Sequence, residues 1–425
     1  MTPPARPGAP RPERITGTMQ PMRYPLRLIT ARDRGTIERY FTEAGVDPYG
    51  IDVIAGKADI VVVRVDGVPA PAANIMKQQL LSLGADAAVH RAAITGGPDR
   101  STVYIVADRN RLALLPAKFA RQPFGLPELG EAVERLAAAA FSPPRPVRLP
   151  GGELDLSAGP VVMGILNVTP DSFSDGGTYR EPGRAAERAF AMAEEGAGVV
   201  DVGGESTRPG AAPVSVEEEL ARVKPVLERL AGRLPVPLSI DTRRSEVARA
   251  ALDLGASIIN DVTGLAGDPA MADLASKRGA AVVVMHMLGT PETMQVDPRY
   301  GDVTGEVLAW LGSRTGELVS SGVSPESIIV DPGIGFGKRL EHNLALLAEI
   351  GDLRGLGFPV MVGFSRKAFV GSLTGRGAPE RLAGGLAALG RCCAAGVGLV
   401  RVHDVRETAD YIKVWRAIER TERER

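Results

Sequence analysis

The pattern of apolar and polar positions divides the chain into two regions. From about residue 153 onward, short runs rich in Val and Ile alternate with Ala-, Leu-, Glu- and Arg-rich stretches of helical length. Eight such runs occur, at 161–167, 198–204, 236–241, 256–261, 280–287, 327–333, 359–365 and 398–404. Because they are too uniformly apolar to face water, we predict parallel strands that are covered on both faces.

Eight consecutive strand–helix units are the repeat of a (β/α)8 TIM barrel. An open doubly wound sheet would more often carry a GxGxxG turn after its first strand, and no such turn follows residues 161–167. We therefore predict an α/β chain in which a (β/α)8 barrel occupies residues 153–425.

The region before the barrel predicts a small α/β domain of unknown role at residues 22–141. Strand-like runs at 24–30, 58–67 and 102–108 are mixed there with helix-like stretches at 74–88 and 126–140. Residues 142–152 contain four prolines and two glycines and are interpreted as a linker. Residues 1–21 have no apolar core segment, which indicates a disordered tail and no signal peptide or membrane anchor.

Charge and cysteine content narrow the choice of partners and compartment. The formal net charge is −1, so neither nucleic acid nor an anionic membrane is expected as the main partner. No apolar run approaches the roughly 18 residues of a membrane span. The only cysteines, Cys392 and Cys393, are adjacent and cannot staple the fold, which favours the reducing cytoplasm. The four histidines are scattered without zinc-site spacing.

Polar residues close nearly every predicted barrel strand. In a TIM barrel these strand ends meet at one rim, where the active site is built. Turn chemistry alone would explain any single position. Taking all of these polar strand-end residues out of water together costs free energy unless a polar ligand binds them, so we predict a ligand site at the rim. The residues are Asn167, Asp201, Asp241, Asn260, Asp261, His286, Asp331, Ser365, Arg366, Lys367, Arg401 and His403.

The rim residues fall into two chemical sets. The first suits a flat, donor-rich heterocycle and contains Asp241, Asn260, Asp331 and Lys367. The second offers forked donors and hydroxyls to phosphate oxygens and a carbonyl ligand to a metal, and contains Asn167, Thr207, Arg208, Arg401 and His403. No nucleophile–base pair is present, so a phosphorylated or pyrophosphorylated heterocycle is the predicted substrate. The DPGIGFGK run at 331–338 is not a P-loop, because Pro332 and Arg339 break that motif.

Eight motifs together resemble the dihydropteroate synthase family. They are MGILNVTPDSFSDGG (163–177), DVGGESTRPGA (201–211), SIDTRRSEVA (239–248), INDVTG (259–264), MHMLGTPETMQ (285–295), VDPGIGFGK (330–338), GFSRKAFVG (363–371) and RVHDV (401–405). The resemblance spans about residues 153–420. It implies a TIM barrel that joins 7,8-dihydropterin-6-ylmethyl diphosphate to 4-aminobenzoate with Mg²⁺ assisting, in a family that acts as a homodimer and is the target of sulfonamides.

The resemblance also implies roles for individual residues. Those for the pterin are Asp241, Asn260, Val262, Met285, Asp331 and Lys367. Those for the diphosphate are Asn167, Thr207, Arg208, Arg401 and His403, with Asn167 also the metal ligand. Those for aminobenzoate are Thr207, Pro209, Phe336 and Ser365. The catalytic set is Lys367, Arg208, Arg401 and Asp331.

Two other functions and two residue roles stay open. The barrel could be a pterin-binding methyltransferase, although that class does not need the diphosphate-binding residues. It could also be a non-catalytic paralogue whose N-terminal domain carries the activity. His286 suits a satisfied core residue as well as a ligand, and Glu205 is assigned only to holding the backbone amides of its own loop.

Overall fold

The chain was analysed as a computed structural model, which describes residues 34–55, 57, 60–169, 182–206, 214–291 and 293–424. It divides into two compact units, residues 1–59 and residues 60–425, which are described separately. In the first unit the described elements are α1 (Arg34–Glu43) and α2 (Pro48–Ala55). The predicted tail at 1–21 and the predicted strand at 24–30 lie outside the described residues.

The second unit begins with a small antiparallel sheet and its helices. The strands, in the order β1-β3-β2, are β1 (Ile60–Pro69), β2 (Asp86–Ala88) and β3 (Arg100–Asp108). The helical segments are α3 (Ala70–Ser82), η1 (Ala93–Thr95), α4 (Arg109–Leu112), α5 (Leu115–Phe119) and α6 (Leu126–Phe141). Met76, Ile105 and Phe119 are fully buried in a core separate from that of the barrel. The helix predicted over 74–88 ends at Ser82, because Gly84 adopts a left-handed φ of 72° and the chain turns into β2.

A hairpin begins in the second half of the predicted linker and ends two residues beyond it. Strands β4 (Val147–Leu149) and β5 (Gly152–Leu154) pair antiparallel. Val147 is fully buried in a cluster with side chains from the barrel strands. The segment is therefore a buried strand and not an irregular linker. Val147 and Leu149 alternate with Arg148, so one face of the segment is apolar despite the prolines around it.

Eight parallel strands form the barrel within the described residues. They are β6 (Val161–Asn167), β7 (Val199–Gly203), β8 (Leu238–Asp241), β9 (Ile258–Asp261), β10 (Ala281–Met285), β11 (Ile328–Asp331), β12 (Met361–Val362) and β13 (Leu399–Val402). Their order is β11-β10-β9-β8-β7-β6-β13-β12. A parallel bridge between Val330 and Val360 joins the two ends of this series, so the sheet closes on itself. The predicted (β/α)8 barrel is thereby confirmed.

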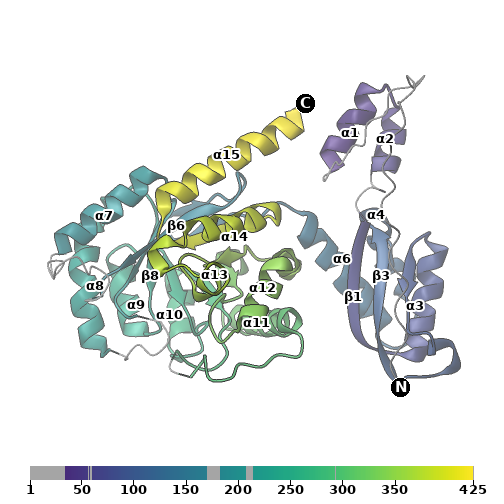
Figure 1. Cartoon of the computed structure of the whole chain (residues 1–425). Coiled ribbons are helices and arrows are strands. Elements are labelled where there is room, and N and C mark those ends of the chain that lie inside the picture. Colours follow the sequence, from purple (N-terminus) through teal and green to yellow (C-terminus); the bar gives the residue numbers. More distant parts are fainter. Residues whose placement is uncertain are drawn as a thin grey trace, which may run out of the picture. The chain divides into compact units, whose positions relative to one another are not determined.

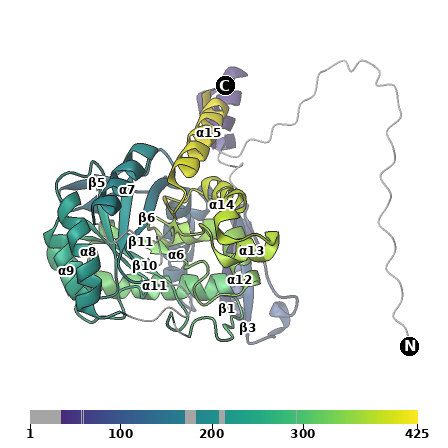
Figure 2. The same ribbon diagram turned by 60° about the vertical axis from the view of Figure 1, so that its left-hand side comes forward.

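Helices surround the strands, as Figures 1 and 2 show. They are α7 (Pro182–Glu195), α8 (Val216–Leu230), α9 (Ser245–Asp253), α10 (Met271–Arg278), α11 (Val303–Ser320), α12 (Leu340–Ala348), α13 (Ala368–Thr374), α14 (Leu382–Ala394) and α15 (Val405–Glu424). Short 3-10 segments are η2 (Pro325–Ser327), η3 (Ile350–Leu356) and η4 (Ala378–Glu380). The described part of the chain has no helix that is long and apolar enough to cross a membrane.

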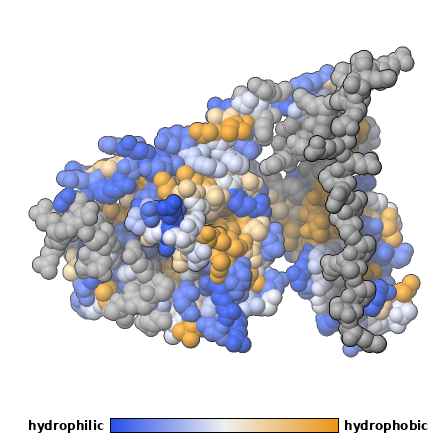
Figure 3. Space-filling view, in the orientation of Figure 1, coloured by the Kyte–Doolittle hydropathy of each residue, from blue (hydrophilic) through white to orange (hydrophobic). Residues whose placement is uncertain are grey.

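The apolar side chains of the strands are buried on both faces, as their composition predicts. One cluster lies between the strands and the helices and includes Val200, Ile259 and Val400. Another joins residues such as Met163 and Ile329 to the β4–β5 hairpin. Hydrophilic side chains are interspersed with apolar areas on the barrel face seen in Figure 3.

Candidate active site

The carboxyl ends of the barrel strands carry most of the predicted site residues. Asn167, Asp241 and Asp331 are the last residues of β6, β8 and β11. Asn260 and Arg401 lie within β9 and β13, one residue before the end. Since parallel strands of a barrel share one carboxyl-terminal rim, these residues surround a common site. Met285 is the last residue of β10, and Val262 and His403 directly follow β9 and β13. The remaining described members lie three to five residues after their strands and are Ser365, Lys367 and Phe336.

Arg401 holds two buried carboxylates together. Its Nε donates to Asp201 Oδ2 at 2.7 Å, and its Nη2 donates to Asp241 Oδ2 at 2.6 Å. Asn260 Nδ2 donates to the same Asp201 oxygen at 2.9 Å. Asp201 is fully buried, and 7% of Asp241 is exposed. Four strands, β7, β8, β9 and β13, are therefore joined by one network of charge-assisted hydrogen bonds.

The electrostatics of this network reflect its burial. Desolvation, only partly opposed by Arg401, raises the pKa of Asp241 to about 7. Burial acts to lower the pKa of Arg401, but Asp201 and Asp241 outweigh it and raise that pKa above its usual value. The guanidinium therefore stays charged in a site that is otherwise rich in acids.

The sequence predicts Asp201 only as the polar end of a strand and assigns it no role, whereas its carboxylate accepts from both Arg401 and Asn260 in this network. A carboxylate inside the apolar run GVVDV was the available signal, because an ionised side chain is rarely fully buried without a partner.

Lys367 and Asp331 form a second charged group on the rim. Lys367 Nζ donates to Ile334 O and lies 4.6 Å from the centre of the Phe336 ring. Asp331 Oδ1 accepts from the backbone N–H of Gly333 at 2.7 Å. Burial lowers the pKa of Lys367 to about 8, with Asp331 opposing the shift, and burial raises the pKa of Asp331. An ammonium and a carboxyl group are thus available to a polar ring, next to an aromatic face.

Ser365 and His403 come from different strand ends and are in contact. His403 Nδ1 lies 3.2 Å from Ser365 Oγ, and the backbone N–H of His403 donates to the same oxygen at 3.2 Å. The resemblance assigns Ser365 to aminobenzoate and His403 to the diphosphate. Their contact places the two predicted subsites side by side.

Three predicted residues, Thr207, Arg208 and Pro209, lie outside the described residues. Glu205, two residues before Thr207, is described and 9% exposed. Its Oε1 accepts from the backbone N–H of Val214 at 3.3 Å, and both of its oxygens accept from Arg243 at 3.1 Å. Glu205 therefore binds a backbone amide on the far side of its loop, as the sequence suggested, and in addition an arginine that follows β8.

Asn167 provides the oxygen that the sequence assigns to a metal. It is partly buried at the end of β6, and its amide oxygen lies 3.7 Å from the Cβ position of Gly203. The described residues contain no group of three or more His, Cys, Asp or Glu side chains arranged for a metal. Mg²⁺ is usually held by one or two carboxylates and completes its shell with water and substrate phosphates. The amide oxygen of Asn167 is a carbonyl ligand, which this ion also accepts.

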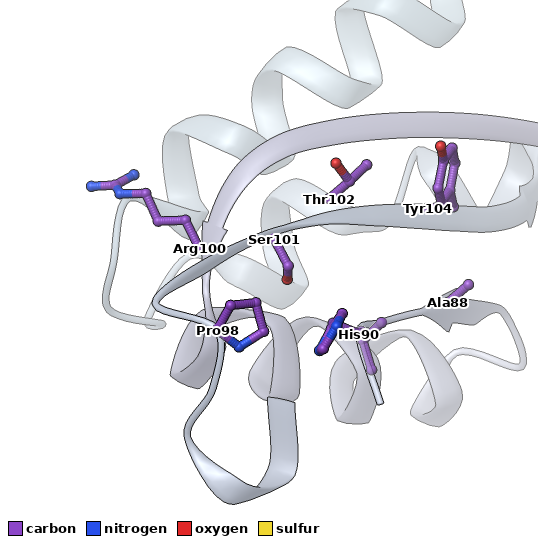
Figure 4. A pocket seen from close by; sticks show the side chains of 8 residues that line it. Ala88, His90, Pro98, Arg100, Ser101, Thr102 and Tyr104 are labelled. Atoms are coloured by element: carbon purple, nitrogen blue, oxygen red, sulfur yellow. The ribbon is translucent and has the colours of Figure 1, made fainter. Parts of the chain in front are cut away.

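A separate hollow of about 540 Å³ belongs to the small domain (Figure 4). It contains none of the predicted site residues. Its lining residues are Ala88, Val89, His90, Pro98, Arg100, Ser101, Thr102 and Tyr104.

Comparison with known proteins agrees with this geometry. The family model of the pterin binding enzymes matches residues 163–403. The chain belongs to the pterin binding enzyme family. It is 49% identical over 265 residues to the dihydropteroate synthase of Neisseria meningitidis serogroup B, covering 61% of this chain and 93% of that protein. It is 47% identical to the Escherichia coli K12 enzyme over 264 residues, covering 62% of this chain and 93% of that protein.

Solved structures give the same result. The dihydropteroate synthase of Xanthomonas albilineans with 4-aminobenzoic acid has a TM-score of 0.61 and 45% identity, covering 65% of this chain and 99% of that one. The same enzyme in complex with 7,8-dihydropteroate has a TM-score of 0.59 and 43% identity, covering 64% and 98% of the two chains. The barrel is that of a dihydropteroate synthase, a transferase of folate biosynthesis.

Proposed function

We propose that the rim transfers the pterin-6-ylmethyl group of 7,8-dihydropterin-6-ylmethyl diphosphate to the amino nitrogen of 4-aminobenzoate. The carbon–oxygen bond to the diphosphate breaks, a carbon–nitrogen bond forms, and the amine loses a proton, giving 7,8-dihydropteroate and pyrophosphate. The observation that carries the proposal is the network in which Arg401 donates to both Asp201 and Asp241. Asn260 donates to the same Asp201 oxygen as Arg401 does. In this network, two carboxylates and an amide, groups suited to hydrogen-bond a heterocycle, lie beside a guanidinium that two of them hold in place.

The pterin is assigned to the acidic side of the rim. Asp331 accepts hydrogen bonds from the amino and ring N–H groups of the pterin, and Lys367 donates to a ring carbonyl or nitrogen. Asp241 and Asn260 hold the remainder of the ring. Val262 and Met285, which are 6% and 5% exposed, form its apolar walls.

The leaving group is assigned to the cationic side. Arg401, His403 and Arg208 bind the diphosphate together with Thr207. Asn167 would hold Mg²⁺, which would neutralise charge on the phosphate oxygens. Because Arg401 is already fixed by two carboxylates, its donors need no reorganisation as the charge of the leaving group develops.

The aminobenzoate is assigned to the space beside Phe336 and Ser365, with Thr207 and Pro209 completing the pocket. An arylamine is nucleophilic without a strong base, which agrees with the lack of a nucleophile–base pair in the sequence. Catalysis consists mainly of stabilising the departing diphosphate and the pterin methylene cation.

The remaining properties are also proposals. The substrates are small molecules, and neither nucleic acid nor a membrane is a partner. We assign the enzyme to the cytoplasm, which the two adjacent cysteines favour, and to a homodimer, as the family resemblance implies. Sulfonamides are expected to compete with aminobenzoate.

The experiment that tests this function compares two transfers by the same purified protein. Pyrophosphate release should require both the pterin diphosphate and 4-aminobenzoate, and methyltetrahydrofolate should give no methyl transfer. Methyl transfer without condensation would favour the methyltransferase alternative. Failure of the full chain to rescue a folate-auxotrophic strain, together with no pyrophosphate release, would favour a non-catalytic paralogue.

A further inference from the structure

A buried lysine next to the rim has no part in the function described above. Lys338 lies in the segment between β11 and α12, residues 332–339, which is called the β11 loop below, and is only 3% exposed. Its Nζ lies 3.0 Å from His286 Nδ1, 3.0 Å from Phe336 O and 3.4 Å from His286 O. These three acceptors match the three N–H groups of an ammonium. All three N–H donors of the side chain therefore have acceptors within the protein, and none is available to a ligand.

His286 is the partner of this lysine on the neighbouring strand. It directly follows β10 and is 5% exposed, and its ring packs edge-on against Trp310 at a centroid distance of 5.2 Å. Burial lowers the pKa of Lys338 to about 7. When the amine is protonated, Nδ1 of His286 accepts its hydrogen bond and the ring proton lies on Nε2. Burial and the charge of Lys338 lower the pKa of His286 to about 3, which agrees with a neutral ring.

The β11 loop lies directly against the segment that contains His286. Gly333 has a φ of 68°, and a Cβ added there would lie 1.9 Å from His286 O. Gly337 has a φ of 60°, and a Cβ there would lie 2.6 Å from Leu288 O. Two glycines thus allow a close backbone approach, and Lys338 bonds the two segments together at the same place.

The backbone between these glycines is held at successive carbonyls. Gln295 Nε2 donates to Gly335 O at 2.9 Å, Lys338 to Phe336 O, and Tyr300 Oη to Gly337 O at 2.9 Å. The Phe336 ring in turn lies under Lys367 Nζ. Phe336 is consequently fixed from both sides, through its carbonyl by Lys338 and through its ring by Lys367.

We propose that Lys338 and His286 form a positioning pair that sets the place of Phe336 between the pterin and aminobenzoate subsites. This inference rests on the proposed function, because that function assigns Phe336 to the aminobenzoate pocket and Lys367 to the pterin. Neither member of the pair touches the reacting atoms. Their effect is on where the amine sits relative to the pterin methylene carbon.

The test uses Lys338→Met, which removes all three donors and keeps an unbranched apolar side chain of similar length. The KM for aminobenzoate should rise about 10-fold or more and kcat should fall, since a small misplacement of a reactant is costly. Binding of the pterin diphosphate, measured by calorimetry, should stay within about three-fold of wild type because Asp241 and Asn260 are untouched. Lys277→Met, on an exposed lysine paired with Asp273, is the matched control.

A second pair of variants covers the case in which Lys338→Met does not fold. His286→Asn keeps an acceptor close to the position of Nδ1 and should approach wild-type KM, whereas His286→Leu should reproduce the defect. Equal behaviour of these two variants overturns the proposal. So does a Lys338→Met enzyme whose aminobenzoate KM is unchanged, or one whose pterin and aminobenzoate affinities fall by the same factor.

Wild-type turnover separates this inference from the proposed function. If the wild type does not release pyrophosphate, the proposed function fails. If the wild type and Lys277→Met turn over while Lys338→Met shows no change in the KM for aminobenzoate, only the positioning role fails.

Discussion

Asp201→Asn is the substitution that most directly perturbs the charged network of the rim. The replacement is nearly isosteric and removes one negative charge from a side chain that is fully buried. Arg401 then keeps Asp241 as its only carboxylate in the network, and Asn260 loses a charged acceptor. The expected result is a folded enzyme with a poorly held guanidinium.

The magnitude follows from the two contacts at Asp201 Oδ2. Hydrogen bonds to a charged group contribute about 1.5–3 kcal/mol, and neutral ones about 0.5–1.5 kcal/mol. The Asn260 contact becomes a bond between two neutral groups, and the Arg401 contact keeps its charged donor but loses the ion pair with a carboxylate. We assign each of these losses about 1–1.5 kcal/mol, or about 2–3 kcal/mol for the two together. If the transition state loses all of this stabilisation and the free enzyme loses none, kcat/KM falls by about 30- to 160-fold.

The assay is continuous pyrophosphate release with both substrates, together with a thermal melt of each variant. Asp253→Asn is the matched control, since Asp253 is 57% exposed and pairs with Arg278 on the surface. That variant should stay within about two-fold of wild type, because exposed pairs contribute about 0–1 kcal/mol. A folded Asp201→Asn enzyme within about three-fold of wild type would refute the role given to the network.

Two further predictions concern the other side of the rim. Lys367 is charged below its pKa of about 8, so kcat/KM for the pterin diphosphate should fall as the pH rises through that value. Lys367→Arg should lack this decline over the same pH range. A pH–rate profile of the variant that matches that of the wild type would contradict the assignment. Gly333→Ala should destabilise the fold by at least about 3 kcal/mol in chemical denaturation, because the added Cβ would lie 1.9 Å from His286 O at a left-handed φ. Gly316→Ala is the control, since a Cβ at that position would have no atom within 4 Å, and it should not destabilise the fold.

The barrel could be predicted from the sequence because its signal is repeated eight times. Buried parallel strands need apolar residues on both faces, and such runs as 161–167 and 281–285 keep that composition over their whole length. The rim followed from the fold alone, since residues that close the strands converge in space. The small domain was predicted less well: Asp86–Ala88 continues a helical pattern in sequence, yet it pairs with β3.

Side-chain partners could not be predicted from the sequence. Which carboxylates Arg401 contacts depends on the tilt of the strands that carry Asp201 and Asp241, and no local pattern encodes that distance. The pairing of His286 with Lys338 crosses 52 residues of sequence and depends on glycines that let two loops approach. The motifs located these residues, but only the packed barrel shows which of them touch.

The most direct test of the account is the amount of 7,8-dihydropteroate and pyrophosphate formed by the wild type, Lys367→Ala and Arg208→Ala. We predict equal amounts of the two products from the wild type and a strong loss in both variants, because one lacks the ammonium assigned to the pterin and the other a guanidinium assigned to the diphosphate. Unimpaired turnover in both variants would contradict the placement of the reaction at this rim.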